Sequence, residues 1–129
     1  MRRGSEAFER GDYAATFATW HPDVEWDTTH FADWPDDAVY RGRDEVIRFL
    51  QEEWVGGWAS YESRMEGVFD AGDKVVVFWL QRMVGRESGV EVEGQAAVVC
   101  TVRDGLVTRI DNYTDRDEAM RAAGLEPQR

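Results

Sequence analysis

Four strand-like segments follow one another between residues 58 and 113, and only short turn sequences separate them. They span 58–70, 74–84, 90–103 and 106–113, and they are joined by DAGD, GRESG and RDG. Short connections rich in glycine and aspartate are typical of tight turns, which return the chain antiparallel to the strand it has left. The sequence therefore predicts an antiparallel meander, a feature that restricts the possible folds more than any other in the chain.

Helical signals precede this meander. Segments with helical spacing begin at Ser5 and at Asp12, both of which are good N-cap residues. The clearest helix covers residues 43–54 and carries one apolar stripe. The stripe consists of Val46, Ile47, Leu50 and Trp54. Between the helices we expect a short alternating strand at 24–31 and a loop at 32–42.

One further helix follows the meander. Asp115 is placed to cap it, and Gly124 ends it shortly before Pro127. Helices, then a long antiparallel meander, then a helix are the order of an α+β protein rather than of an alternating α/β one. Because the chain has 129 residues, we expect a single domain that spans residues 1–129.

The strand at 74–84 is apolar on both faces, since adjacent strand residues point to opposite sides of a sheet. One face carries Val75, Val77, Trp79, Gln81 and Met83, and the other carries Val76, Phe78 and Leu80. Helices can cover one face, and the other needs a second cover. A second copy of the same sheet is the simplest one, so we expect a homodimer through the outer face of Val76, Phe78 and Leu80.

Charge and cysteine content exclude several classes of partner. The 26 acidic residues outnumber the 15 Lys and Arg, for a formal net charge of −11. An acidic surface repels phosphate backbones and anionic lipids, so we expect neither nucleic acid nor a membrane as a partner. The single cysteine, Cys100, allows no intrachain disulfide, and without a visible signal sequence we expect a cytoplasmic protein. Two histidines and one cysteine without ligand spacing indicate no metal site.

Five segments, taken in order, resemble the NTF2-like superfamily in its SnoaL-like branch. They are FERGDYAATFATWHPDVEW, VYRGRDEVIRFL, DAGDKVVV, SGVEVEGQAAVVCTVRDGLVTRI and YTDRDEAMRAAGL. The resemblance extends from Glu6 to Leu125 and implies a cone: a strongly curved, mostly antiparallel sheet wraps around the N-terminal helices and encloses a deep, mostly apolar pocket. It also implies dimers through the outer sheet face. Because this fold serves several chemistries and also non-catalytic proteins, the residues in the cone must decide the activity.

The stretch DNYTD, at the end of the last strand, places a polar residue on each face. By alternation Asn112 shares the inward face with Ile110 and Thr108, whereas Asp111 lies on the outer face beside Arg109. In epoxide hydrolases of the superfamily this strand ends in an Asp-Tyr-x-Asp pattern, and the resemblance puts Asn112 at its first Asp. An amide has no protonation role near neutral pH.

Two further positions weigh against hydrolase chemistry. The epoxide hydrolases carry Arg-x-Asp on the long strand, and the resemblance places Trp79 and Gln81 there. Since the acid–base groups are missing from both strands, epoxide hydrolysis is not expected.

The inward positions predict a ligand pocket. Its walls are Trp26, Thr28, His30, Tyr40, Trp54, Val77, Trp79, Gln81, Val98, Ile110 and Asn112. Apolar walls with a few polar groups are typical of sites for small organic molecules. We therefore expect a small hydrophobic molecule with one or two oxygens as the partner, and no cofactor.

Whether such a molecule is only bound or also converted stays open. The alternative is a cofactor-independent isomerase or cyclase that acts on a polyketide- or steroid-like carbonyl compound. It would need His30 as the base. Tyr40, Gln81 and Asn112 would then orient the carbonyl.

Overall fold

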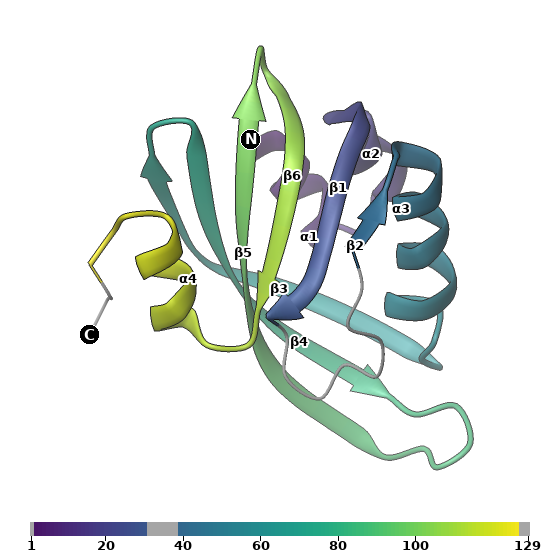
Figure 1. The fold of residues 1–129 in the computed structure, drawn as a ribbon. Coiled ribbons are helices and arrows are strands. Elements are labelled where there is room, and N and C mark those ends of the chain that lie inside the picture. Colours follow the sequence, from purple (N-terminus) through teal and green to yellow (C-terminus); the bar gives the residue numbers. More distant parts are fainter. Residues whose placement is uncertain (1, 31–38, 127–129) are drawn as a thin grey trace.

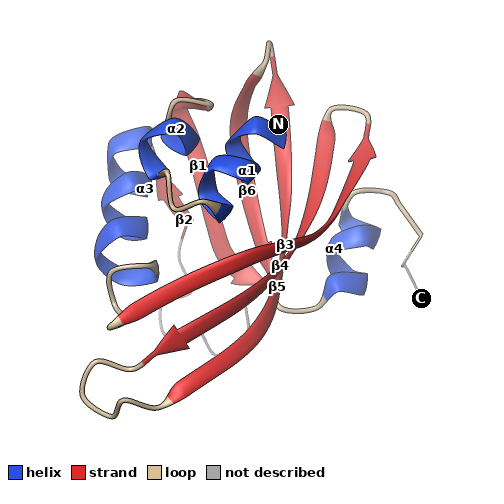
Figure 2. Ribbon diagram, turned by 180° about the vertical axis from the view of Figure 1, so that it is seen from behind, coloured by secondary structure: helices blue, strands red, loops and turns tan. Residues whose placement is uncertain are grey.

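A curved sheet of six strands forms the body of the computed structural model, which describes residues 2–30 and 39–126 (Figure 1). The strands are β1 (Trp20–His30), β2 (Val39–Arg41), β3 (Ser60–Ala71), β4 (Lys74–Val84), β5 (Glu91–Arg103) and β6 (Leu106–Tyr113). The helices are α1 (Arg2–Glu9), α2 (Tyr13–Phe17), α3 (Arg43–Phe49), its continuation η1 (Leu50–Trp54) and α4 (Arg116–Ala122). The sheet curves around α1, α2 and α3, and α4 lies on its other side (Figure 2). The predicted α+β cone is confirmed.

The strand order is β2-β1-β6-β5-β4-β3. β3 to β6 form the predicted antiparallel meander, and β6 then pairs in parallel with β1. That parallel pair places the first strand of the chain next to the last one, so residues near both ends of the sequence share the inner face. Two of the three predicted caps are present: Asp12 accepts from the Ala15 amide, and Asp115 accepts from the Asp117 and Glu118 amides. The prediction that Ser5 caps the first helix is wrong, because α1 already begins at Arg2 and Ser5 lies buried within it.

The first strand differs from the prediction. β1 begins at Trp20 rather than at residue 24, and it runs through Pro22. Its pairing with β6 is interrupted between Trp20 and Glu25. Proline is tolerated in this irregular stretch because no ladder hydrogen bond needs its missing N–H. The predicted loop at 32–42 also contains the three-residue strand β2, which pairs with β1, while residues 31–38 lie outside the described residues.

The helix predicted at 43–54 changes its geometry halfway. It is α-helical to Phe49 and then widens into a π-helical turn, in which the Val55 amide donates to the Leu50 carbonyl at 2.8 Å. The next residue must be a glycine, because a Cβ atom on Gly56 would overlap the backbone carbonyl of Gln51. The turn buries Trp54 against the inner face of the sheet.

Helix α4 of the same chain covers much of the outer face of β4, the face predicted for the dimer, while the homodimer itself stays a prediction. Val76 and Phe78 are 0% and 8% exposed and pack in one cluster with Ala119 and Met120 of α4. Only Leu80, beyond this cluster, stays half-buried. The argument for a second sheet assumed that no helix was available for this side. The C-terminal helix was predicted, but its periodicity does not say on which face of a sheet it docks.

The inner face carries the larger core. Trp20, Trp26, Phe49, Leu50, Trp54 and Ile110 belong to one buried cluster between the sheet and the helices. A neighbouring cluster contains Val75, Val77, Trp79 and Ala96. Among the described helices, none is long and apolar enough to cross a membrane.

Candidate ligand-binding cavity

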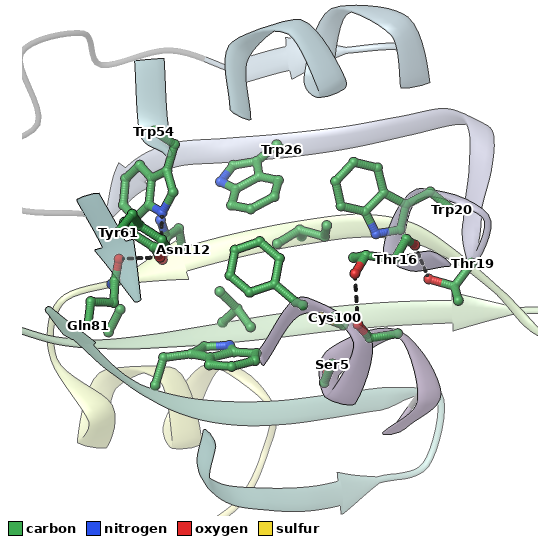
Figure 3. Close-up of a pocket in the computed structure, with 16 residues that line it drawn as sticks. Ser5, Thr16, Thr19, Trp20, Trp26, Trp54, Tyr61, Gln81, Cys100 and Asn112 are labelled. Carbon is green, nitrogen blue, oxygen red and sulfur yellow. Dashed lines mark hydrogen bonds between the residues drawn. The ribbon is translucent and has the colours of Figure 1, made fainter. Parts of the chain in front are cut away.

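A cavity lies between the inner face of the sheet and helices α1, α2 and η1, and it is partly open to solvent (Figure 3). Aromatic side chains supply much of its wall: Phe8, Trp20, Trp26, Trp54, Tyr61 and Trp79. The volume is about 60 Å³, well below the roughly 300–1,000 Å³ of sites that hold drug-sized ligands. It is also smaller than the roughly 150 Å³ of a cavity that binds benzene, so a single ring must extend into the open side or move the walls, and a polycyclic compound requires a larger movement.

Ring-to-ring contacts hold the aromatic wall in place. The ring centroids of Phe8 and Trp79 lie 5.4 Å apart, edge to face, which joins α1 to β4 across the cavity. Trp26 contacts Trp20 edge to face at 5.9 Å and Trp54 at 6.5 Å. Tilted and edge-to-face arrangements at such distances are the favourable ones for aromatic pairs. Much of the wall is therefore a cluster of aromatic rings that contact one another.

A chain of hydrogen bonds crosses part of the cavity. The Trp54 indole N–H donates to the Tyr61 hydroxyl at 3.2 Å, and that hydroxyl donates to Gln81 Oε1 at 2.7 Å (Figure 3). Burial raises the pKa of Tyr61 above its ordinary value, so the phenol stays protonated. These three residues satisfy one another, and they orient the Gln81 amide.

Two other polar side chains in the wall have no such partners. Trp26 and Asn112 are 6% and 1% exposed. Among the described residues, neither the Trp26 Nε1 atom nor either amide atom of Asn112 has a hydrogen-bond partner. The predicted inward orientation of Asn112 is confirmed, and its amide forms no hydrogen bond with Gln81 or Tyr40.

The described part of the wall contains no side chain that exchanges protons near neutral pH. Asp, Glu, His, Lys and Arg are missing from the lining residues. Burial, with a smaller contribution from the charge of Asp111, raises the pKa of the lining residue Cys100 to about 12. The cavity is thus built to hold neutral groups, because a buried charge needs a paired partner.

Several residues predicted for the pocket line this cavity: Trp26, Trp54, Trp79, Gln81, Val98, Ile110 and Asn112. Four lie elsewhere. His30 is exposed and stacks on Tyr113 at 4.7 Å, because the pairing of β1 with β6 shifts between Asp27 and His30 and breaks the alternation behind its placement. The proposed base therefore stands outside the cavity wall.

The other three also have different surroundings. Tyr40 lies on the short strand β2, and its ring stacks on that of Phe49 with the ring centroids 4.0 Å apart. Thr28 and Val77 are fully buried in the protein interior. They share the inward side of their strands with true lining residues, but the cavity does not extend to them.

Sequence reasoning also missed part of the wall. Tyr61 pairs with Met83 in the β3–β4 ladder, two positions from the pair of Ser63 with Gln81, so alternation on β3 could have found it. The helical contributors could not be found in this way, because short helices give no direct sign of which side meets the sheet. They include Ser5 and Phe8 of α1 and Thr16 of α2.

Charged groups gather on the opposite face of β1 and β6. Arg109 contacts Asp27 at 2.7 Å, Asp111 at 3.0 Å and Glu25 at 3.3 Å. Burial alone would raise the pKa of Asp27, but hydrogen bonds from Thr29 and the charge of Arg109 lower it below the ordinary value. The predicted outward orientation of Asp111 and its pairing with Arg109 are confirmed, and these carboxylates point away from the cavity.

A family model described as a SnoaL-like domain matches residues 1–110 of the chain. Among solved structures, an NTF2-like protein from Burkholderia thailandensis is 28% identical, with a TM-score of 0.78 over 88% of this chain and 86% of that one. No curated protein sequence matches the chain at a significant level.

Two more distant structures hold small organic molecules. A Mycobacterium tuberculosis protein in complex with estradiol-17beta-hemisuccinate has a TM-score of 0.70 at 16% identity, covering 90% of this chain and 91% of that one. A Catenulispora acidiphila protein with a ketosteroid isomerase-like fold, in complex with trimethylamine, has a TM-score of 0.69 at 14% identity, covering 98% and 92%. At these identities the likeness concerns the fold.

Proposed function

Because the chain belongs to the SnoaL-like domain family, we propose that it binds a small, neutral, largely apolar organic molecule in the cavity between its sheet and its N-terminal helices. The observation that carries this proposal is the lining: it has aromatic walls and a few oriented polar atoms, and none of the described lining side chains ionises near neutral pH. Apolar walls with a few placed polar groups are the usual composition of small-molecule sites.

Two relatives support the proposal, since each was solved with a small organic compound: estradiol-17beta-hemisuccinate in one and trimethylamine in the other. The cavity of about 60 Å³ favours a compound nearer the size of a single ring than of a steroid. A neutral compound fits better than an ammonium ion, because the described lining contains no carboxylate that could pair with a buried cation.

Isomerase or cyclase chemistry on a carbonyl compound is not our proposal. Such a reaction needs a base beside the substrate, and the described wall offers none. His30, the candidate base, stacks on Tyr113 in solvent. The fold alone does not supply this chemistry.

Ligand-dependent thermal stability tests binding. Cyclohexanol and cyclohexylamine have the same shape, but the amine is charged at neutral pH, so we expect only the alcohol to raise the melting temperature. Stabilisation follows RT ln(1 + [L]/Kd), or about 2.7 kcal/mol at a hundredfold excess over Kd.

A matched pair of variants locates the effect. Val98→Phe fills the cavity, whereas Val92→Phe makes the same change at an exposed position of the same strand, 41% exposed and outside the lining. Val98→Phe should abolish the response to cyclohexanol and Val92→Phe should keep it. An equal response in both variants would place binding elsewhere and refute the proposal.

A further inference from the structure

Three unpartnered polar atoms of the cavity wall belong to two neighbouring strands. The Trp26 Nε1 atom comes from β1, and the Asn112 Nδ2 and Oδ1 atoms come from β6. Among the described residues only one other buried side-chain atom lacks a partner, Nε of Arg116, a residue that does not line the cavity. Unsatisfied buried polar atoms are rare in folded proteins, and their concentration in one wall calls for an explanation.

Strand register brings the two side chains together. Trp26 pairs with Ile110 in the parallel β1–β6 ladder, and Asn112 lies two residues further along on the same face. A strand spacing of about 4.8 Å and a rise of about 3.3 Å per residue separate their Cα atoms by roughly 8 Å. Figure 3 shows both side chains on the cavity side of their strands. A ligand that contacts this part of the wall therefore lies beside both side chains.

The neighbouring polar groups do not compete for these atoms. Trp54, Tyr61 and Gln81 are joined to one another, and Oε1 of Gln81 already accepts the Tyr61 proton. Among the fully buried polar atoms of the described wall, those without a partner are therefore one indole donor and both atoms of one amide.

That combination has a specific chemical complement. A side-chain amide presents a donor and an acceptor side by side, and it pairs best with a group that carries an acceptor beside a donor. A carbonyl next to an N–H or O–H group satisfies this condition. The carbonyl oxygen accepts from Asn112 Nδ2, and the N–H or O–H group donates to Asn112 Oδ1. The second lone pair of the same carbonyl oxygen can accept from Trp26 Nε1.

We propose that the ligand is a small ring compound whose edge carries a carbonyl beside an N–H or O–H donor, as in a lactam, and that Trp26 and Asn112 recognise this edge. The inference rests on the proposed function, and it names the chemical class that the same cavity selects. The aromatic walls then contact the apolar remainder of the ring. A carboxylate does not fit, since the described wall holds no cation to pair with it.

Three compounds of similar size separate the contributions. δ-Valerolactam carries both the acceptor and the donor, cyclohexanone carries only the acceptor, and methylcyclohexane carries neither. Raw affinities are confounded by the different solubilities of the compounds, so each is compared between wild type and variant, as in a double-mutant cycle. Asn112→Leu replaces the amide by an apolar group with the same number and branching of side-chain heavy atoms, and Trp26→Phe removes the indole donor.

Asn112→Leu should weaken lactam binding at least about tenfold, as expected for lost hydrogen bonds to a buried group. It should weaken cyclohexanone less and leave methylcyclohexane unchanged or bound more tightly. Trp26→Phe should weaken both carbonyl compounds relative to methylcyclohexane. Val98→Ala, which trims a wall residue without polar side-chain atoms, should affect all three compounds alike.

A measurement on the wild type needs no variant to fold. In a ¹H–¹⁵N spectrum, the lactam should shift both the Asn112 side-chain amide signals and the Trp26 indole signal. Methylcyclohexane should shift both sets of signals less. If Asn112→Leu changes lactam and methylcyclohexane binding by the same factor, or if bound lactam leaves both signals in place, this inference is overturned while the proposed function stands. If none of the compounds binds, both are overturned.

Discussion

The two faces of β6 differ in whether their polar side chains are paired. On the outer face, Asp111 lies 3.0 Å from Arg109, which also holds Asp27 at 2.7 Å. On the inner face, one residue further along, Asn112 is 1% exposed and neither of its amide atoms has a partner among the described residues. Polar groups that stabilise a fold are paired with each other, whereas groups that serve a ligand are left unpaired at some loss of stability. Asp111 is paired in this way, and on our proposal the adjacent Asn112 is left unpaired for a ligand.

The largest effect should come from truncating a side chain that α4 covers on the outer face of the sheet. Phe78 is 8% exposed beneath α4, where the Arg116 guanidinium lies 4.7 Å above its ring. Phe78→Ala should lower the free energy of unfolding by about 3–5 kcal/mol, because it leaves a cavity in a packed cluster. Chemical denaturation measures this.

Leu80 provides the control for this change. It points to the same side of β4 but is half-buried, beyond the cluster under α4, so Leu80→Ala should cost markedly less. The loss in Phe78→Ala should also be independent of protein concentration, since the cover belongs to the same chain. A loss that grows on dilution would show that a second molecule, not α4, buries Phe78.

An intermediate effect is expected from the charges of the outer face. Arg109→Met leaves Asp27, Asp111 and Glu25 without their shared cation and should destabilise the protein by about 1–3 kcal/mol. Arg82 also bridges two carboxylates, but its side chain is 56% exposed, so Arg82→Met should leave the free energy of unfolding close to that of wild type. Equal losses in urea denaturation would mean that the partial burial of the Arg109 cluster has no energetic role.

The dependence of the unfolding free energy on acidic pH should also distinguish the paired carboxylates of the outer face from exposed ones. Asp27 has a folded-state pKa below its ordinary value, so its ionised form stabilises the fold above the unfolded pKa of about 3.9, and this contribution disappears as the pH falls through the folded pKa. Asp27→Asn should therefore flatten the loss of unfolding free energy on acidification to about pH 2. Asp23→Asn, on the exposed part of the same strand, should not. If the unfolding free energy of both variants falls in the same way on acidification, the stabilising role of ionised Asp27 is contradicted.

Alternation along single strands predicted much of this arrangement. It placed Asn112, Trp79 and Gln81 in the wall and Asp111 on the outer face, because β4 and β6 are regular where these residues lie. The register shift in β1 displaced His30, since a bulge reverses which residues face inward. Local sequence carries little information about such a shift.

Helix docking was the second limit. The helical pattern of 116–122 was visible, but its place over Val76 and Phe78 depends on the path of the chain after β6. The same holds for Phe8, whose contact with Trp79 closes one side of the cavity across a long sequence separation. Cavity walls assembled from remote helices follow from tertiary packing and not from periodicity.

The most direct test of the contrast between the two faces is the unfolding free energy of two adjacent variants, Asp111→Leu and Asn112→Leu, measured by denaturant in the absence of ligand. Asp111→Leu removes a paired carboxylate and should lower it by about 1–2 kcal/mol. Asn112→Leu removes an unpaired buried amide and should raise it by about 1 kcal/mol. If Asn112→Leu instead lowers the free energy of unfolding as much as Asp111→Leu does, the amide is a structural group, and the account of Asn112 as a residue kept for a ligand is contradicted.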